Sequence, residues 1–364
     1  MKKVIISGGG TGGHIFPAIA IANELKLQFP DIDILFIGAE GKMEMEKVPA
    51  AGYRIIGLPV VGLQRRLTIK NLMLPFKLVK SLNRAKKIIK EFSPDVVIGV
   101  GGYASAPTLR SAAKLKIPTL IQEQNSYPGV TNKLLSKKVK TICVAYDGLD
   151  TFFRKDKIRL TGNPVRKDLI RLNVTKTEAC EALGLNPDKK TVLSVGGSLG
   201  ARTINESILA NIEFFKENDI QLVWQTGKWF HEKALAGVDT ESYPGIKVFD
   251  FISRMDLVYA AADVIVSRAG AIAISELCLI GKPTILVPSP NVSEDHQTKN
   301  AMALVNKGAA VMVCDADAQS ELITELETLL GDENKQISLS DNCKKLGIPD
   351  ATEKIVKEII NLIK

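Results

Sequence analysis

The sequence predicts an α/β protein with two doubly wound domains, each built on a parallel β-sheet. A glycine-rich loop occurs twice, at residues 8–14 and 196–202, and each loop follows an apolar run and precedes a helical pattern. Glycine lets backbone N–H groups approach a ligand, and a helix N-terminus adds free donors and partial positive charge. Two such loops in separate halves of the chain indicate two ligand-binding domains that face one cleft.

Nearly continuous runs of Val, Ile and Leu predict the strands. They lie at residues 4–7, 34–37, 96–99, 119–122, 141–145, 192–195, 222–226, 246–249, 264–267, 284–287 and 310–314. Helical patterns separate them, for example at 16–29, 204–216 and 272–279. Apolar strands alternating with helices are typical of parallel sheets covered on both faces. Such sheets bind ligands at the carboxyl ends of their strands.

The length of 364 residues favours two domains. A turn-like segment, Gly162-Asn163-Pro164, marks the change between the halves and divides the chain into residues 1–162 and 163–344. Residues 351–364 have the pattern of an amphipathic helix. We expect the C-terminal segment, 345–364, to pack back on the first domain.

Composition excludes several classes of protein. Apolar residues make up 45% and charged residues 24%, which indicates a globular chain. No apolar run approaches the roughly 18 residues that a spanning helix needs, and the N-terminus reaches glycine too soon for a signal peptide. The five cysteines lack metal-ligand spacing, and the Asp-x-Asp pairs at 31–33 and 315–317 are interpreted as turns. We therefore expect a cytoplasmic protein without a metal site.

The net charge of +8 is concentrated in one segment. Residues 64–90 contain nine Lys or Arg and no acid. Helical order places Leu72, Phe76, Val79, Leu82 and Ile89 on one face and Lys77, Lys80, Arg84 and Lys87 on another. An ordinary amphipathic helix would fit, but the cations and the apolar tip around Leu72, Met73 and Phe76 favour contact with an anionic membrane. Nucleic acid is not expected, because few aromatic residues interleave the cations.

The first glycine loop carries a candidate catalytic base. His14 closes the loop at a helix N-terminus, which disfavours the charged imidazole and predicts a neutral proton acceptor near pH 7. Glu123 and Asn125 follow a predicted strand in a polar run, which suggests a site. The spacing Gly8-x-Gly10-x-x-Gly13 also fits a dinucleotide site, with Glu40 as its acid.

Two further side chains in the second half are candidates. Glu276 lies on the helix opened by Ser267-Arg268-Ala269-Gly270, where a carboxylate can accept hydrogen bonds from a ribose diol; a helix salt bridge is the alternative. His296 is compatible with a functional or a packing role, and His231 has the pattern of a surface residue.

These residues resemble, in order, the motifs of the MurG family of glycosyltransferases. The motifs are Gly9-Gly10-Thr11-Gly12-Gly13-His14-x-x-Pro17, Gly101-Gly102-Tyr103, Glu123-Gln124-Asn125, Gly162-Asn163-Pro164-Val165-Arg166, Gly196-Gly197-Ser198-x-Gly200-Ala201-Arg202, Ser267-Arg268-Ala269-Gly270 through Ser275-Glu276, and His296-Gln297. The resemblance covers nearly the whole chain. It implies a GT-B fold of two Rossmann-like domains. It also implies metal-independent, inverting transfer of N-acetylglucosamine (GlcNAc) from UDP to the C4 hydroxyl of the muramyl sugar of undecaprenyl-diphosphate lipid I, giving lipid II.

The resemblance also implies the site. In the second domain Ser198 and Arg166 would contact the diphosphate, the Ile252 backbone the uracil, Glu276 the ribose and Gln297 the sugar. From the first domain Thr11, Gly12, Gly13 and Asn125 would complete the donor site. No cofactor is implied. The implied location is peripheral, on the cytoplasmic face of the cell membrane, with other cell-wall enzymes as partners.

Inversion needs a base opposite the leaving UDP. His14 is the leading candidate and Glu123 the rival; a helix N-terminus behind residues 196–200, with Arg166, would stabilise the leaving diphosphate. Three alternatives stay open: a UDP-GlcNAc 2-epimerase on the same fold, a nicotinamide-dependent dehydrogenase, and a non-catalytic membrane-binding module. The dehydrogenase leaves the second loop unexplained.

Overall fold

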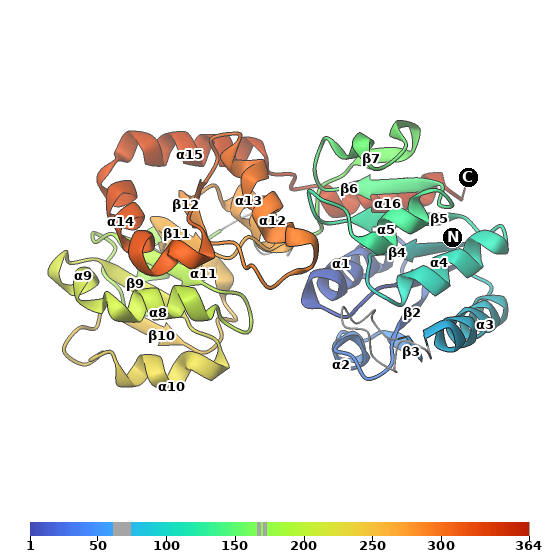
Figure 1. Cartoon of the computed structure of the whole chain (residues 1–364), viewed down its shortest axis with the longest axis horizontal. Helices are drawn as coiled ribbons and strands as arrows, with labels where there is room; N and C mark the ends of the chain where they lie inside the picture. The colour runs from blue at the N-terminus through green and yellow to red at the C-terminus, as the bar shows by residue number, and fades with distance from the viewer. Residues whose placement is uncertain (61–73, 166–168, 170–172, 364) are drawn as a thin grey trace. The chain divides into compact units, whose positions relative to one another are not determined.

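The computed structural model describes residues 1–60, 74–165, 169 and 173–363. The chain forms two compact units (Figure 1). Unit 1 comprises Met1–Val165 and Asp350–Lys364, and unit 2 comprises Arg166–Pro349. The C-terminal residues thus belong to the same unit as the N-terminal ones. No helix in the described part of the chain combines the length and the apolar character needed to cross a membrane.

Unit 1 contains a parallel sheet in the order β3-β2-β1-β4-β5-β6-β7. Its strands are β1 (Lys3–Ser7), β2 (Asp33–Ala39), β3 (Arg54–Leu58), β4 (Val96–Gly99), β5 (Thr119–Glu123), β6 (Thr141–Val144) and β7 (Ile158–Leu160). The strands β3 and β7 were not predicted. Both are edge strands with partly exposed residues, so neither has a continuous apolar run.

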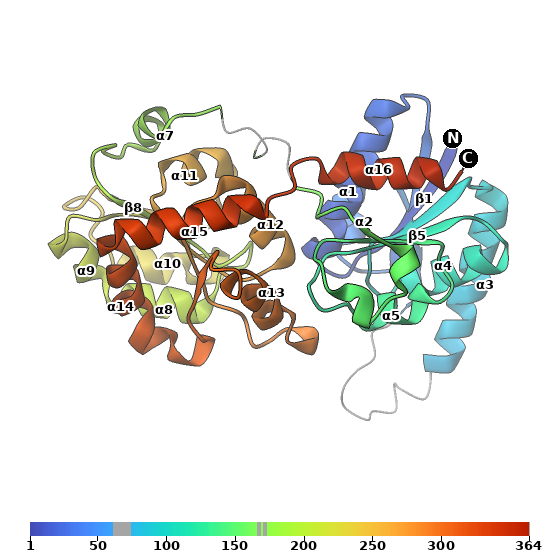
Figure 2. The ribbon, with the colours of Figure 1, turned by 90° about the horizontal axis from the view of Figure 1, so that it is seen from above.

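Helices cover both faces of the unit 1 sheet. They are α1 (Gly12–Gln28), α2 (Glu44–Ala50), α3 (Leu74–Phe92), α4 (Ser105–Lys114), α5 (Val130–Ser136) and α16 (Ala351–Asn361). Val4 and Ile6 of β1 pack in one core cluster with α1 and α16, whereas Ile5 packs in another with α3, α4 and α5. This two-sided burial explains the continuous apolar runs. Figure 2 shows α16 passing over α1, and the two helices share one core cluster.

Unit 2 contains a parallel sheet in the order β10-β9-β8-β11-β12-β13. The strands are β8 (Thr191–Val195), β9 (Gln221–Gln225), β10 (Ile246–Phe249), β11 (Val264–Ser267), β12 (Thr284–Leu286) and β13 (Val311–Met312). The helices are α7 (Lys176–Leu183), α8 (Arg202–Ala210), α9 (Ile212–Glu217), α10 (Lys228–Ala236), α11 (Met255–Ala261), α12 (Ala271–Ile280), α13 (His296–Val305), α14 (Ala318–Gly331) and α15 (Glu333–Lys345). Trp224 and Phe215 are its largest fully buried side chains.

The single helix predicted at residues 204–216 is wrong. The chain forms two helices, α8 and α9, which are separated at Asn211. Asn211 leaves the helical conformation, with φ −121° and ψ 30°, and its Nδ2 donates to the Ser207 carbonyl at 2.9 Å. A side chain that bonds to the local backbone competes with continuation of the helix.

Candidate active site

The first glycine loop is shaped by close backbone packing. It follows β1 and lies against the segment that follows the neighbouring strand β4. A Cβ on Gly102 would lie 2.2 Å from the Gly9 carbonyl oxygen, and a Cβ on Gly8 would lie 2.1 Å from a Val100 methyl carbon. Gly101 and Gly102 also have positive φ, at 97° and 84°. Glycine is therefore required on both sides of this contact.

His14 lies in the first turn of α1 and turns its ring back onto the loop. Its Nδ1 is 3.1 Å from the Gly9 carbonyl oxygen and 3.3 Å from Thr11 Oγ1. Because a carbonyl can only accept, the bond to Gly9 places the proton on Nδ1 and leaves the Nε2 lone pair available. A Cβ on Gly101 would lie 2.7 Å from Nε2. The imidazole thus occupies space that a side chain at position 101 would take.

The pKa of His14 supports a neutral ring. Burial lowers this pKa below its usual value, and the hydrogen bond to Gly9 and the negative charge of Glu44 act in the opposite direction. A neutral imidazole is expected from the sequence as well, but its main cause is desolvation of the ring and not the helix N-terminus. At neutral pH the ring can accept a proton.

Glu123 is held by its own loop. It is buried, with 1% exposure, at the end of β5. Its carboxylate accepts hydrogen bonds from the Asn125 N–H and Nδ2, the Gly129 N–H and the Asn132 Nδ2, at 2.8–3.2 Å. Four donors occupy the acceptor sites of the carboxylate. Glu123 therefore orients Asn125 and the start of α5, an arrangement that favours His14 as the base.

The second glycine loop joins β8 to α8. A Cβ on Gly200 would lie 1.9 Å from the Thr226 carbonyl oxygen, and one on Gly196 would lie 2.3 Å from the Ala201 nitrogen. Ser198 is exposed at this loop. The loop thus carries an exposed hydroxyl four residues before the first residue of α8, and a loop that leads into a helix N-terminus binds phosphate in many nucleotide sites.

Gln225 is a site residue that the sequence analysis missed. It is buried at the end of β9. Its Nε2 donates to the Gly197 carbonyl and its Oε1 accepts from the Ile252 N–H, both at 2.9 Å. One amide thus ties the second glycine loop to the segment expected to bind uracil. A single glutamine at the end of a strand is common, so the sequence around Gln225 does not indicate that it connects these two segments.

Glu276 and Gln297 also follow carboxyl strand ends in unit 2. Glu276 is 9% exposed on α12, after β11, and accepts from the Tyr259 hydroxyl at 3.3 Å. Gln297 Oε1 accepts from the Ser289 N–H at 2.9 Å, which directs the amide nitrogen away from that backbone.

Asp315 connects further loops of unit 2. The Asp-x-Asp segment at 315–317 forms a short 3₁₀ helix, in agreement with the turn predicted there. In addition, the Asp315 carboxylate forms an ion pair with Arg268, which precedes α12, and accepts from the Thr203 hydroxyl of α8 at 3.0 Å. Arg268 also donates to the Val287 and Pro288 carbonyls. The network therefore joins the loops that follow β8, β11 and β12.

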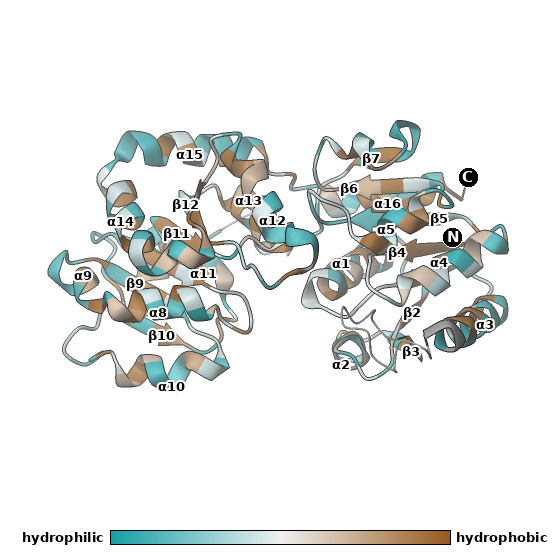
Figure 3. Ribbon diagram, viewed as in Figure 1, coloured by the Kyte–Doolittle hydropathy of each residue, from teal (hydrophilic) through white to brown (hydrophobic). Residues whose placement is uncertain are grey.

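The helix α3 is more exposed at its start than expected. Ser81, Ala85, Ile88 and Ile89 are buried, whereas Val79 is 56% exposed, so the face predicted to carry both Val79 and Ile89 is buried only toward the end of the helix. Lys77, Leu78 and Lys80 beside it are exposed as well. Figure 3 shows hydrophilic and hydrophobic residues mixed along this helix.

Arg84 has a partner of its own. Its guanidinium pairs with Glu40 at 2.5 Å. Glu40, the acid of the dinucleotide interpretation, is therefore engaged by α3. Leu72, Met73 and Arg166 lie outside the described residues; Phe76 lies in α3, but its side chain is outside the description.

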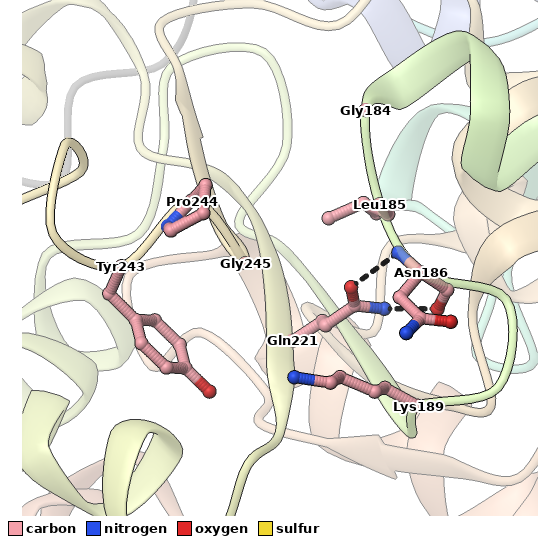
Figure 4. A pocket seen from close by; sticks show the side chains of 8 residues that line it. All are labelled: Gly184, Leu185, Asn186, Lys189, Gln221, Tyr243, Pro244 and Gly245. Carbon is pink, nitrogen blue, oxygen red and sulfur yellow. Dashed lines mark hydrogen bonds between the residues drawn. The ribbon is translucent and has the colours of Figure 1, made fainter.

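A pocket of about 310 Å³ lies at the opposite end of the unit 2 sheet (Figure 4). It is lined by residues near the amino ends of β8, β9 and β10: Gly184, Leu185, Asn186, Lys189, Gln221, Tyr243, Pro244 and Gly245. The Gln221 amide that lines it is bonded to both backbone groups of Asn186. The pocket contains none of the predicted site residues.

Two parallel-sheet units, each with a glycine loop at the carboxyl end of its first strand, form the GT-B fold. Residues 4–144 match the glycosyltransferase family 28 N-terminal domain, and residues 191–355 match its C-terminal domain. The chain belongs to the MurG enzymes of glycosyltransferase family 28.

Individual relatives agree. A Parabacteroides distasonis protein named UDP-N-acetylglucosamine–N-acetylmuramyl-(pentapeptide) pyrophosphoryl-undecaprenol N-acetylglucosamine transferase is 55% identical over 99% of this chain and 98% of its own. A Flavobacterium psychrophilum protein of the same name is 54% identical over the same shares. The crystal structure of Acinetobacter baumannii MurG has a TM-score of 0.82, with 29% identity, and covers 99% of this chain and 100% of its own.

Proposed function

We propose that this enzyme transfers GlcNAc from UDP-GlcNAc to the C4 hydroxyl of the N-acetylmuramyl sugar of lipid I, giving lipid II for peptidoglycan synthesis. The observation that carries the mechanism is the His14 ring, whose Nδ1 is bonded to Gly9 and whose Nε2 is left as a proton acceptor. The transferase names of the relatives favour this reaction over the 2-epimerase alternative.

The reaction is a single displacement with inversion. The His14 Nε2 takes the proton of the C4 hydroxyl while that oxygen attacks C1 of GlcNAc. The bond between C1 and the phosphate oxygen breaks, and UDP leaves with the electron pair. Ser198, Arg166 and the N-terminus of α8 stabilise the charge that develops on the diphosphate. The catalytic work is therefore shared between proton removal and electrostatic stabilisation.

Unit 2 holds the donor in this proposal. Because the Ile252 N–H already donates to Gln225, we assign its carbonyl oxygen to the uracil N3–H. Glu276 accepts from the ribose, and the Gln297 amide nitrogen donates to the sugar hydroxyls. The contacts predicted for Thr11, Gly12, Gly13 and Asn125 stay predictions from the family resemblance.

Unit 1 carries the membrane contact in this proposal. The exposed cations Lys77 and Lys80 flank the exposed Leu78 and Val79 at the start of α3. Cations attract anionic headgroups, and apolar side chains between them can enter the interface. We infer a peripheral position on the cytoplasmic face, where lipid I would be reached; association with other cell-wall enzymes stays a prediction.

The activity is tested by UDP release from UDP-GlcNAc with and without a lipid I analogue. Release that depends on acceptor supports the proposal, whereas acceptor-independent release or epimerisation at C2 contradicts it. For the base, His14→Ala should lower kcat by about 10²- to 10⁴-fold. His231→Ala, a histidine on α10 of unit 2 whose ring contacts Thr226, is the control for loss of a histidine outside the first glycine loop. Near-normal turnover of the His14 variant with both substrates saturating would remove His14 from the mechanism.

The membrane contact is tested with vesicles of phosphatidylglycerol and phosphatidylethanolamine. Lys77→Glu with Lys80→Glu should weaken binding by at least about 30-fold, since each surface cation contributes about 1 kcal/mol. Arg84 is left unchanged because its reversal would also break the pair with Glu40. Lys86→Glu with Lys90→Glu makes the same charge change at the other end of α3. Equal losses in the two variants would refute a contact centred on the start of this helix.

A further inference from the structure

A buried carboxylate lies directly under the first glycine loop. Glu44, the first residue of α2, is 1% exposed. Its Oε1 accepts from the Ala39 N–H and its Oε2 accepts from the Gly10 N–H, both at 2.9 Å. The carboxylate thus joins the carboxyl ends of β2 and β1. This is the place where a parallel sheet with such a loop ordinarily receives a ligand.

Two glycines make room for this side chain. A Cβ on Gly9 would lie 2.1 Å from Glu44 Oε1, and a Cβ on Gly38 would lie 2.6 Å from Glu44 Cγ. Gly9 has φ +146°, a conformation that favours glycine. Glycine is therefore required at position 9 of the first loop, and at position 38 of β2, because the Glu44 side chain occupies the adjoining space.

The hydrogen bonds of Glu44 and His14 meet at one peptide group. The Gly10 N–H, which donates to Glu44, and the Gly9 carbonyl, which accepts from His14 Nδ1, belong to the same amide. A carboxylate bonded to the N–H of an amide polarises it and makes its carbonyl a stronger acceptor. A stronger acceptor at Gly9 favours the tautomer in which Nδ1 carries the proton.

We propose that Glu44 is a positioning residue for His14, acting through the Gly9–Gly10 peptide to fix the ring orientation and keep Nε2 as the acceptor. The proposal rests on the proposed function, in which His14 is the base. It also assigns the Gly10 N–H to an internal carboxylate, so this donor is not the group that binds a substrate phosphate.

Few groups surround the His14 ring that could set its tautomer and its pKa. The loop after β1 contributes the Gly9 carbonyl and the Thr11 hydroxyl, the segment after β4 contributes the Gly101 backbone, and α2 contributes Glu44. Among the described charged side chains, Glu44 is the one that acts on the pKa of His14, and it raises that pKa. Neutralising Glu44 should therefore lower the pKa of His14 further.

The test compares Glu44→Gln with Glu46→Gln in the full-length protein. Glu46 lies two residues along the same helix, is exposed and pairs with Lys47 on the surface. Nitrogen-15 NMR of labelled histidine, assigned with a His14→Gln variant, reports the tautomer and the titration of His14. In the wild type the neutral ring should carry its proton on Nδ1. In Glu44→Gln the tautomers should mix, the titration should move to lower pH, and kcat should fall by about 10- to 100-fold.

The Glu46 variant should keep the wild-type tautomer, titration and kcat. A wild-type ring protonated on Nε2 overturns the proposal without any variant, which covers the case that Glu44→Gln does not fold. An unchanged tautomer and titration in Glu44→Gln also overturn it. If His14→Ala retains turnover while Glu44→Gln alters the tautomer, the role of His14 as base fails but its coupling to Glu44 stands.

Discussion

Substitution of Gly101 by alanine should displace the His14 ring and so lower kcat by more than the accompanying loss of fold stability can explain. The new Cβ would lie 2.7 Å from His14 Nε2, whereas ordinary contact begins near 3.4 Å, so the ring must move by about 0.7 Å. A misplacement of about 1 Å can cost about 100-fold in rate. We therefore expect kcat to fall by about 10- to 100-fold, with the KM for UDP-GlcNAc nearly unchanged.

The strain of an alanine at positive φ must be controlled for. Gly101 has φ +97°, and Gly52, which follows α2, has φ +83° with open space around its Cβ position. Each alanine should cost about 1 to 2 kcal/mol, or roughly 2 to 8 °C in the melting temperature of a unit of this size. Steady-state kinetics and thermal unfolding of both variants show whether the loss of kcat comes from displacement of His14 or from backbone strain. If Gly52→Ala loses as much kcat as Gly101→Ala, steric displacement of His14 is refuted.

Three further predictions follow from the same contacts. Because burial lowers the pKa of His14 below 6.5, the acid limb of kcat/KM should have its midpoint below pH 6.5, which a pH series of activity checks. The same shift makes the folded protein lose stability as the pH falls from 6.5 through the lower folded-state pKa, which unfolding measured over the same pH range checks. Glu123→Gln should destabilise unit 1 by about 1 to 3 kcal/mol because an amide nitrogen replaces one buried acceptor, without shifting the pH profile; a lost acid limb would instead make Glu123 the base. Arg268→Ala should cost about 3 kcal/mol by leaving Asp315 unpaired and should weaken UDP binding in calorimetry, whereas unaltered binding would show that the network does not hold the donor loops.

The central strands were predictable because burial on both faces leaves a direct mark in the sequence. In β1, Val4 and Ile6 face one core and Ile5 the other, so the run is apolar at every position. The edge strands β3 and β7 have exposed positions and leave no such mark. The break at Asn211 depends on one side-chain bond to the backbone, which periodicity does not detect.

The site was predictable where glycine or histidine stands out from its neighbours, and not where a polar residue acts through buried partners. His14 was found because histidine is rare here and this one closes a glycine loop. Glu44 resembles Glu40 and Glu46 in the sequence, yet it alone of the three is buried. The gaps that receive it, at Gly9 and Gly38, are 29 residues apart and are adjacent only because β1 pairs with β2.

The packing of α16 on α1 has a consequence for the order in which the protein is made. The core around Val4 and Ile6 includes Ile355, Val356 and Ile359, so it cannot close until these late residues have been synthesised. At about 5 to 20 residues per second, the ribosome adds the intervening chain of roughly 350 residues in about 17 to 70 s. During that time unit 2, which is continuous in sequence, can fold first. The nascent N-terminal half therefore exposes apolar surface for longer than its place in the chain suggests, and removal of α16 should leave it a chaperone substrate.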